Sequence, residues 1–179
     1  KSIIGKKVNN ASILDVGCGW GLALLYLKKK GLQCYGFDPA PEAVEYGNKK
    51  GLNLKFAGLD GMDVFEGKKF DIVMLNNVLE HLEDPEKTLN QVKNILNDGG
   101  LLTIDVPNEF NEFQLAGKKI HNLSDWWVCP PNHLNYFSSE TLVNLLKGLN
   151  FKIEHFESSF PLEMFLLFGD NYVKNVKIG

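Results

Sequence analysis

Residues 13–21 read Ile-Leu-Asp-Val-Gly-Cys-Gly-Trp-Gly, an apolar run that leads directly into a turn rich in glycine. Glycines remove side chains where the backbone must approach a ligand closely. A helical pattern follows over residues 22–30, and the free N–H groups at the start of a helix form an electropositive end. The next strand-like run closes with Asp38, about twenty residues on, where the hydroxyls of a ribose need an acceptor. The stretch predicts a unit that binds a nucleoside.

The composition sets broad limits on the rest of the molecule. The chain has 179 residues, of which 44% are hydrophobic and 23% charged, and this suits one α/β domain with a substantial core. A formal charge of −3 gives no electrostatic reason to expect nucleic-acid binding. No apolar run reaches the ~18–20 residues of a membrane helix, so no membrane association is expected. Cys18, Cys34 and Cys129 are odd in number and widely spaced, which predicts free thiols and a cytoplasmic protein.

Strand and helix patterns alternate along the chain, as in a parallel sheet with helical crossovers. The continuous apolar run at 71–75 is typical of a central strand buried on both faces. Residues 97–100, Asn-Asp-Gly-Gly, are expected to end a helix in a turn. Strands are expected at 13–16, 33–37, 54–57, 71–75, 101–106 and 151–157, and helices at 22–30, 41–50, 84–96 and after a cap at Ser138.

The regular pattern fails between residues 108 and 136, where aromatic, amide and proline residues accumulate. A connection of this length without regular structure is typical of a functional lid or a flexible segment. We therefore expect a single domain over residues 1–179, with a lid or an insertion that binds the second substrate at about 108–136.

The spacing of the glycines separates two kinds of nucleoside cofactor. A dinucleotide site requires G-x-G-x-x-G, whose third glycine permits close helix packing below a pyrophosphate. Here Gly21 arrives one residue early, Leu22 fills the expected slot, and the bulky Trp20 would lie beside the pyrophosphate. S-adenosylmethionine has no phosphate, so the turn favours this smaller cofactor.

Five ordered motifs resemble those of class I S-adenosylmethionine-dependent methyltransferases. Residues 14–21 resemble the first motif of the family, and Leu79-Glu80-His81-Leu82 resembles the signature of the branch that contains ubiquinone-biosynthesis O-methyltransferases. The resemblance covers roughly residues 13–156 and implies a Rossmann-like three-layer α/β sandwich. It also implies a mostly parallel sheet of seven strands, whose last strand is either missing or supplied by residues 172–178. The other similar segments are 35–39, 70–73 and 96–100.

The resemblance also implies which residues contact the cofactor. Gly17 and Gly19 back the methionine portion, and Asp15 steers its ammonium group. Asp38 accepts from the ribose hydroxyls, while the residues after the third strand face adenine. For Asp15 the alternative is a residue that caps the turn, and for Cys18 it is a small filler beneath the turn. The full set implied is Asp15, Gly17, Cys18, Gly19, Asp38, Pro39, Leu59, Asp60 and Asn76.

Two histidines are candidates for catalysis. His81 follows the fourth strand, and His133 lies just before the capped helix; either could take a proton from a hydroxyl group. The alternative for each is a structural histidine that bonds to the backbone. Neither has partners at the spacing of metal ligands, so no metal site is expected. Four aromatic residues of the irregular segment either line a pocket for the methyl acceptor or pack the lid: Phe110, Phe113, Trp126 and Trp127.

The sequence thus predicts transfer of a methyl group from S-adenosylmethionine to a small hydroxylated metabolite, such as a saccharide or a phenol. Alignment of two reactants supplies roughly 7–11 kcal/mol and a positioned base about 10²–10⁴-fold, so cofactor contacts matter more than either histidine. Two alternatives remain: a nicotinamide-dependent oxidoreductase or epimerase, and a non-catalytic S-adenosylmethionine-binding protein. The expected partners are a small methyl acceptor, without nucleic acid or membrane, and the expected state is a monomer or weak homodimer.

Overall fold

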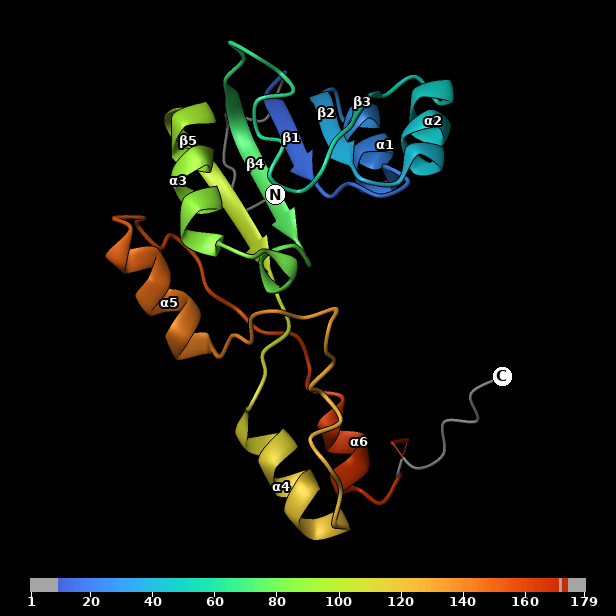
Figure 1. Ribbon diagram of the computed structural model, residues 1–179, viewed down its shortest axis with the longest axis vertical. Coiled ribbons are helices and arrows are strands. Elements are labelled where there is room, and N and C mark those ends of the chain that lie inside the picture. Colours follow the sequence, from blue (N-terminus) through green and yellow to red (C-terminus); the bar gives the residue numbers. More distant parts are fainter. Residues whose placement is uncertain (1–9, 171, 174–179) are drawn as a thin grey trace. The chain divides into compact units, whose positions relative to one another are not determined.

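Figure 1 shows the computed structural model of the chain, which describes residues 10–170, 172 and 173. The chain divides into two compact units, residues 1–106 and 107–179. The first unit alternates strands with helices, and the second consists of helices and loops. The assignment of residues 108–136 as a lid within a single domain stays a prediction.

The first unit is a parallel α/β sheet of five described strands in the order β3-β2-β1-β4-β5. The chain adds β2 and β3 on one side of β1, and β4 and β5 on the other side. Because crossovers between parallel strands are right-handed, α1 and α2 lie on one face of the sheet and α3 lies on the other. The predicted three-layer α/β class is therefore confirmed. In chain order the elements are β1 (Ser12–Val16), α1 (Leu22–Lys29), β2 (Gln33–Asp38), α2 (Pro41–Lys49), β3 (Asn53–Phe56), β4 (Phe70–Asn76), the 3₁₀ helix η2 (Leu79–His81), α3 (Pro85–Ile95) and β5 (Leu96–Asp105).

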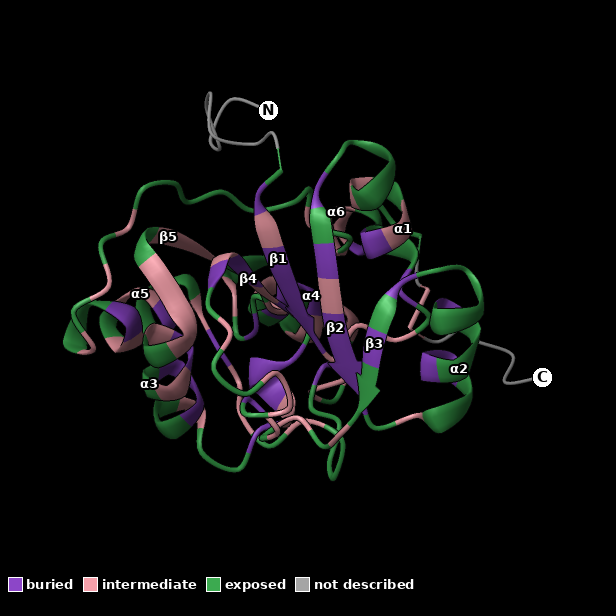
Figure 2. Ribbon diagram, turned by 90° about the horizontal axis from the view of Figure 1, so that it is seen from above, coloured by how far each residue is buried: buried purple, intermediate pink, exposed green. Residues whose placement is uncertain are grey.

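The core of this unit lies around its three inner strands, β2, β1 and β4. Figure 2 shows purple, buried stretches in β1 and β2, and Leu14 of β1 and Val73 of β4 are fully buried. Leu24 of α1 and Val44 of α2 pack against Ile13 in one hydrophobic cluster. The apolar run at 71–75 is thus the central strand that the sequence predicts. Because these strands are buried and paired on both sides, they determine where the loops at the carboxyl edge of the sheet begin.

Strand β5 differs from the prediction at its start. Residues 97–100, expected to form a turn, belong to β5, and the pairing with β4 shifts register between Phe70 and Ile72. Gly99 adopts a φ of +70°, which lets the strand bulge here. The Asn-Asp-Gly-Gly sequence therefore produces an irregularity inside the strand, and the predicted turn is wrong.

The second unit contains helices α4 (Glu112–His121), α5 (Ser139–Gly148) and α6 (Glu163–Leu167). Helix α4 contradicts the expectation that residues 108–136 lack regular structure. Its start is a capping box, because the Gln114 N–H donates to Asn111 Oδ1 at 3.0 Å and the Asn111 N–H to Gln114 Oε1 at 3.3 Å. Helix α5 begins as predicted, since the Thr141 N–H donates to Ser138 Oγ at 3.2 Å.

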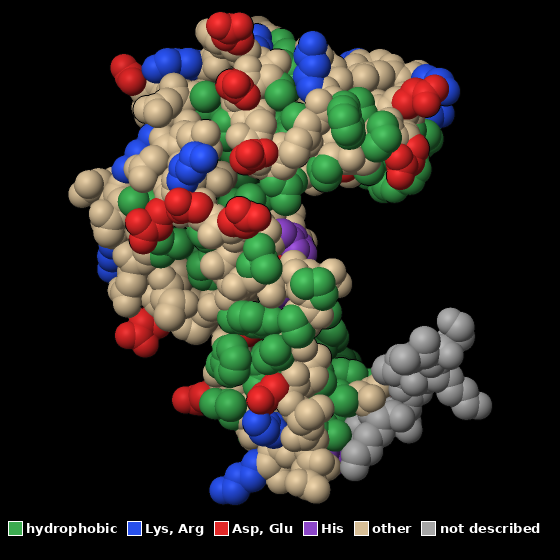
Figure 3. All heavy atoms as spheres, viewed as in Figure 1, with side chains coloured by type: hydrophobic (Ala, Val, Ile, Leu, Met, Phe, Trp, Pro, Cys, Tyr) green, Lys and Arg blue, Asp and Glu red, His purple; other side chains and the backbone are tan. Residues whose placement is uncertain are grey.

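Helix α6 packs against α4 at a glycine. A Cβ on Gly117 would lie 2.7 Å from Leu166 Cδ2, and Leu166 is fully buried. His121 of α4 lies with Nε2 2.9 Å from the Leu166 carbonyl oxygen. Figure 3 shows hydrophobic side chains gathered over this unit, and several of those that flank α6 are exposed, including Phe160, Leu162 and Phe168.

The predicted strand at 151–157 is absent, because these residues have no regular structure and most of them are exposed. Phe151 and Ile153 follow the alternation of a half-buried strand, but this segment pairs with none of the described strands of the sheet. The other proposed source of a last strand, residues 172–178, lies largely outside the described residues; 172 and 173 form a turn. Among the described residues, the helices all lack the length and hydrophobicity needed to cross a bilayer.

Candidate functional site

The glycine turn follows β1 at the carboxyl edge of the sheet, the edge where open α/β sheets place their ligands. Gly17 has a φ of +65°, a conformation that favours glycine. A Cβ at Gly17 would lie 3.0 Å from Val78 Cγ2 and 3.1 Å from Leu59 Cδ2. The loops after β3 and β4 therefore close in on the turn, and the predicted site residues Gly17 and Leu59 lie together.

Asp38, the last residue of β2, is tied to this turn. Its Oδ2 accepts the Gly19 N–H at 2.7 Å, and its Oδ1 accepts the Ala40 N–H at 2.9 Å. The residue is only 8% exposed. Each carboxylate oxygen carries two lone pairs, so Asp38 can accept further bonds from a ligand. The sequence prediction that Asp38 and the turn form one site is consistent with this geometry.

Asp15 lies next to this site, buried in β1. Burial, with a smaller contribution from the charge of Asp38, raises the pKa of Asp15 to about 7. A cationic group bound nearby would favour the ionised carboxylate. The position therefore suits an ammonium group.

Cys18 lies in the turn with its sulfur against the sheet. Its N–H donates to the Phe37 carbonyl at 3.1 Å, and a Cβ on Gly36 would come within 2.8 Å of its Sγ. Burial, followed by the charges of Asp15 and Asp38, raises the pKa of the Cys18 thiol to about 12. The neutral thiol fills space beneath the turn and is unsuited to act as a nucleophile.

Other predicted residues also lie at this edge of the sheet. Pro39 and Asp60 are exposed, in the segments after β2 and β3. Asn76 ends β4 opposite Asp105, whose carbonyl oxygen accepts the Asn77 N–H at 2.8 Å. The first unit thus brings its cofactor-site candidates to one edge.

His81 ends η2 and lies three residues after Val78, which flanks the glycine turn. Its Nε2 lies 3.9 Å from Glu80 Oε1, beyond hydrogen-bond distance, and Glu80 is buried. The His81 N–H donates to the Val78 carbonyl at 3.0 Å. The short helix thus fixes the backbone of this candidate.

His133 belongs to the second unit and has a partner that the sequence did not indicate. Its Nδ1 lies 3.3 Å from Oε1 of Glu109, and Glu109 is only 3% exposed. The two residues are 24 positions apart, so no local spacing links them. A buried carboxylate beside an imidazole is the arrangement that orients a histidine for proton transfer.

A cluster of aromatic rings reaches His133 through Tyr136, whose ring lies 6.2 Å from the imidazole. The Phe110 ring lies edge-on to those of Trp127 and Tyr136, with centroids 5.6 and 6.1 Å away. Phe110 has a φ of +57°, uncommon for a bulky residue, and remains half-exposed. Trp126 stacks edge-on to Trp127 at 4.7 Å, whereas Phe113 is exposed on α4. Trp127 is buried within this cluster, while Phe110 leaves an apolar ring half-exposed.

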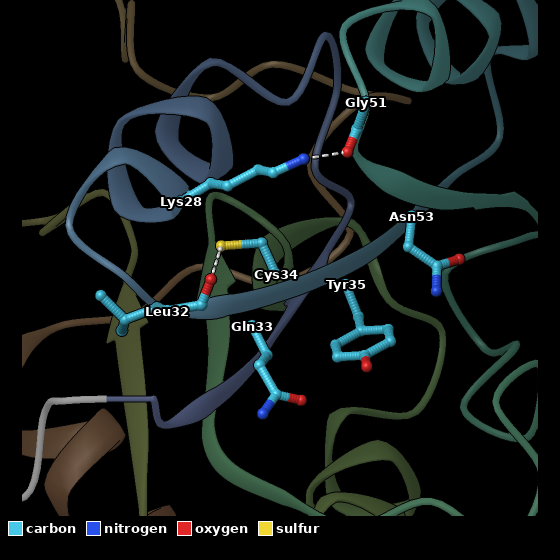
Figure 4. Close-up of a pocket in the computed structure, with 7 residues that line it drawn as sticks. All are labelled: Lys28, Leu32, Gln33, Cys34, Tyr35, Gly51 and Asn53. Atoms are coloured by element: carbon cyan, nitrogen blue, oxygen red, sulfur yellow. Dashed lines mark hydrogen bonds between the residues drawn. The ribbon is translucent and has the colours of Figure 1, made fainter.

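Two hollows lie away from the glycine turn. Figure 4 shows one of about 310 Å³ at the amino ends of β2 and β3, the sheet edge opposite the turn. The Lys28 ammonium donates to the Gly51 carbonyl beside it. A second hollow of about 320 Å³ in the second unit is lined by Leu162, Phe165, Asp170 and Tyr172. Neither contains a cofactor-site candidate from the first unit.

Comparison with known proteins finds methyltransferases. The model of a methyltransferase domain family matches residues 2–156. A ubiquinone biosynthesis O-methyltransferase of Cereibacter sphaeroides is 30% identical over 101 residues, covering 54% of this chain and 41% of the relative. An ajmaline N-methyltransferase of Rauvolfia serpentina is 34% identical over 151 residues, covering 74% and 50%. The chain therefore spans half or less of the length of these two relatives.

A solved structure resembles the fold over most of the chain. The S-adenosylmethionine-dependent methyltransferase of Mesorhizobium loti superposes with a TM-score of 0.69 at 18% identity, covering 94% of this chain and 86% of that one. At this identity the likeness concerns the fold. Together with the family match over residues 2–156, it identifies the chain as a member of the class I S-adenosylmethionine-dependent methyltransferase family.

Proposed function

We propose that the chain transfers a methyl group from S-adenosylmethionine to a hydroxyl group of a small metabolite. The observation that carries the cofactor assignment is the bond between the Gly19 N–H and Asp38 Oδ2 at 2.7 Å. It holds an acceptor carboxylate against a turn with little side-chain bulk, as a ribose beside a short amino-acid chain requires. Asp15 lies nearby as the group that would pair with the cofactor's ammonium.

The cofactor supplies an activated methyl group, whose carbon forms a bond to the acceptor oxygen as its bond to sulfur breaks. The chain's own residues hold the reactants, and such alignment supplies roughly 7–11 kcal/mol. The hydroxyl proton passes to His133 in this proposal, and a positioned base adds about 10²–10⁴-fold. His81 is assigned to contact with the substrate rather than to proton transfer.

The acceptor class follows from the second unit. The half-exposed ring of Phe110 and the partly buried ring of Tyr136, backed by the buried Trp127, offer apolar area to a flat or sugar-like molecule, and in this proposal the imidazole of His133 accepts a proton from its hydroxyl. The printed names of the curated relatives include both an O- and an N-methyltransferase. In this proposal the carboxylate–imidazole pair carries the choice of a hydroxyl acceptor, because a hydroxyl group must lose its proton as its oxygen is methylated and the imidazole can accept that proton.

Two measurements test this function. Calorimetric titration with S-adenosylhomocysteine and with NADH is expected to give binding for the first compound and none for the second. The chain is then incubated with S-adenosylmethionine and a panel of phenols, saccharides and aliphatic amines, and mass spectrometry detects methylated products. O-methylated products support the proposal. N-methylated amines alone, or cofactor binding without any product, contradict it.

A further inference from the structure

We propose that Glu109 is a positioning residue that holds the His133 ring in its Nδ1–H tautomer. Nε2 is then the nitrogen that accepts a proton. This inference rests on the proposed function, in which His133 takes the proton of the acceptor hydroxyl. The proposal gives a role to Glu109, a residue of the second unit that no sequence motif identified.

The chemistry of the contact decides the direction of the hydrogen bond. Glu109 Oε1 lies 3.3 Å from His133 Nδ1. The proposal takes Glu109 as ionised; an ionised carboxylate only accepts, so the proton of this bond then belongs to Nδ1. In a neutral imidazole one nitrogen donates and the other accepts, and the contact therefore makes Nε2 the basic one.

Burial and backbone bonds hold both partners in place. The side chains of His133 and Glu109 are 21% and 4% exposed, so little water competes for the contact. The Glu109 N–H donates to the Phe137 carbonyl at 2.8 Å, and the His133 N–H donates to the Cys129 carbonyl at 3.0 Å. The loop that carries Glu109 and the loop that carries His133 are therefore each held by a backbone hydrogen bond.

The same loop also carries an aromatic ring. Phe110 follows Glu109 directly, and its positive φ turns the chain so that its ring meets those of Trp127 and Tyr136. The Tyr136 ring in turn lies 6.2 Å from the imidazole of His133. A non-glycine residue in this conformation is retained where the surroundings enforce it, often at functional sites. Residues 109 and 110 therefore position the carboxylate and the aromatic surface together.

The other histidines provide internal references. His121 Nε2 lies 2.9 Å from the Leu166 carbonyl oxygen, which only accepts, so this ring is expected in the opposite, Nε2–H tautomer. His155 Nε2 lies 2.9 Å from Glu157 Oε2, and both side chains are exposed. One protein thus contains a partly buried Nδ1–carboxylate pair, a partly buried Nε2–carbonyl pair and an exposed Nε2–carboxylate pair.

Nitrogen-15 NMR of the whole chain tests the proposal directly. Long-range ring proton–nitrogen correlations distinguish protonated from non-protonated nitrogens, and they are recorded at about pH 9, above the ordinary imidazole pKa of about 6.5. Single His→Gln variants assign the four rings. The expected result for His133 is a protonated Nδ1 and a non-protonated Nε2, with the reverse for His121. A His133 ring protonated on Nε2 would overturn the proposal.

Substitution of the carboxylate provides the second arm. Glu109→Leu is expected to shift His133 toward the Nε2–H form, while the backbone amide spectrum stays dispersed and His121 is unchanged. Glu157→Leu is the matched control, which removes an exposed carboxylate partner and should leave His133 untouched. A folded Glu109→Leu variant with an unchanged His133 tautomer would contradict the role. If this variant does not fold, the wild-type spectrum decides the question by itself.

The spectra require neither cofactor nor acceptor, so the two proposals fail separately. An Nδ1–H ring in a chain that makes no methylated product contradicts the proposed function. An Nε2–H ring in a chain that does make O-methylated product contradicts the positioning role of Glu109.

Discussion

The main-chain N–H of Gly19 donates to Oδ2 of Asp38 at 2.7 Å, across a gap of 19 residues in the chain. This bond fixes the carboxylate of β2 against the turn after β1 before any ligand arrives. A group already oriented for its ligand loses less conformational entropy on binding. The turn and Asp38 therefore act as one preorganised element.

Asp38→Ala is expected to abolish detectable binding of S-adenosylhomocysteine, because it removes both the ribose acceptor and the anchor of the turn. His81→Ala is expected to leave binding within a few-fold of wild type. Calorimetric titration of the three proteins measures this difference. Asp98→Ala, at an exposed position near the amino end of β5, is the matched control. Unchanged binding by a folded Asp38→Ala variant would refute the assignment.

Asp15→Asn is expected to stabilise the ligand-free chain at pH 8. An acid whose pKa is about 7 when folded, against an ordinary value of 3.8, makes stability fall as pH rises between these two values. Above about pH 7 the full loss of unfolding free energy has been reached. It is as much as about 4 kcal/mol, because each unit of pKa shift corresponds to about 1.4 kcal/mol. Urea unfolding measures the free energy of unfolding of the variant and of the wild type. The two free energies should differ at about pH 8 and should be similar at about pH 4. Equal differences at both pH values would contradict the argument.

Cofactor affinity is expected to fall as pH drops below about 7, because Asp15 must then lose a proton to pair with the ammonium group. The dissociation constant for S-adenosylhomocysteine should rise by up to about tenfold per pH unit. Calorimetric titrations with S-adenosylhomocysteine in buffers of different ionisation enthalpy measure how many protons the chain releases on binding. In Asp15→Asn, overall binding should be weaker and this release should vanish; proton release that persists in the variant would assign the linkage to another group.

Gly36→Ala is expected to destabilise the first unit by about 1–3 kcal/mol. The added Cβ would lie 2.8 Å from Cys18 Sγ and 2.9 Å from Leu24 Cδ1, so the packing beneath the turn must shift. Gly148→Ala is the control, since a Cβ there meets nothing within 4 Å. Thermal melts should show a loss for the first variant and no loss for the second.

Asn111→Ala is expected to destabilise α4 by about 1 kcal/mol, because the Gln114 N–H loses its acceptor. Ser138→Ala removes the equivalent cap of α5 and should have a similar cost. Amide hydrogen exchange locates each effect in its own helix. Faster exchange spread evenly over both helices in either variant would argue against local caps.

The elements that the sequence predicted correctly are those encoded locally. The strands of the first unit have runs or alternations of apolar residues, and the turn after β1 has glycines at every second position, 17, 19 and 21, each with a positive φ. Each signal lies within a few residues of the structure that it produces. The turn could therefore be recognised, and the place of Asp38 at the end of the second strand could be inferred from the general geometry of parallel sheets. The hydrogen bond between Gly19 and Asp38 was not predicted.

The features that were missed depend on partners far along the chain or on weak local signals. The alternation around Ile153 resembles a strand, but strand formation needs a neighbour with free pairing groups. The cap of α4 was hidden because Asn111 and Gln114 occur among aromatic residues and prolines that suggest a loop. Glu109 could not be linked to His133, since tertiary folding alone brings the two loops together.

The unequal environments of the thiols give the chain a natural attachment point for a reporter group. Cys18 is held neutral, with a pKa of about 12, Cys34 is buried with a raised pKa, and Cys129 is exposed. Maleimide dyes react with accessible thiolates, so labelling of the wild-type chain should reach Cys129 selectively. That residue accepts a backbone bond from the His133 N–H, so a dye there would report on the histidine loop by fluorescence, without any engineered cysteine.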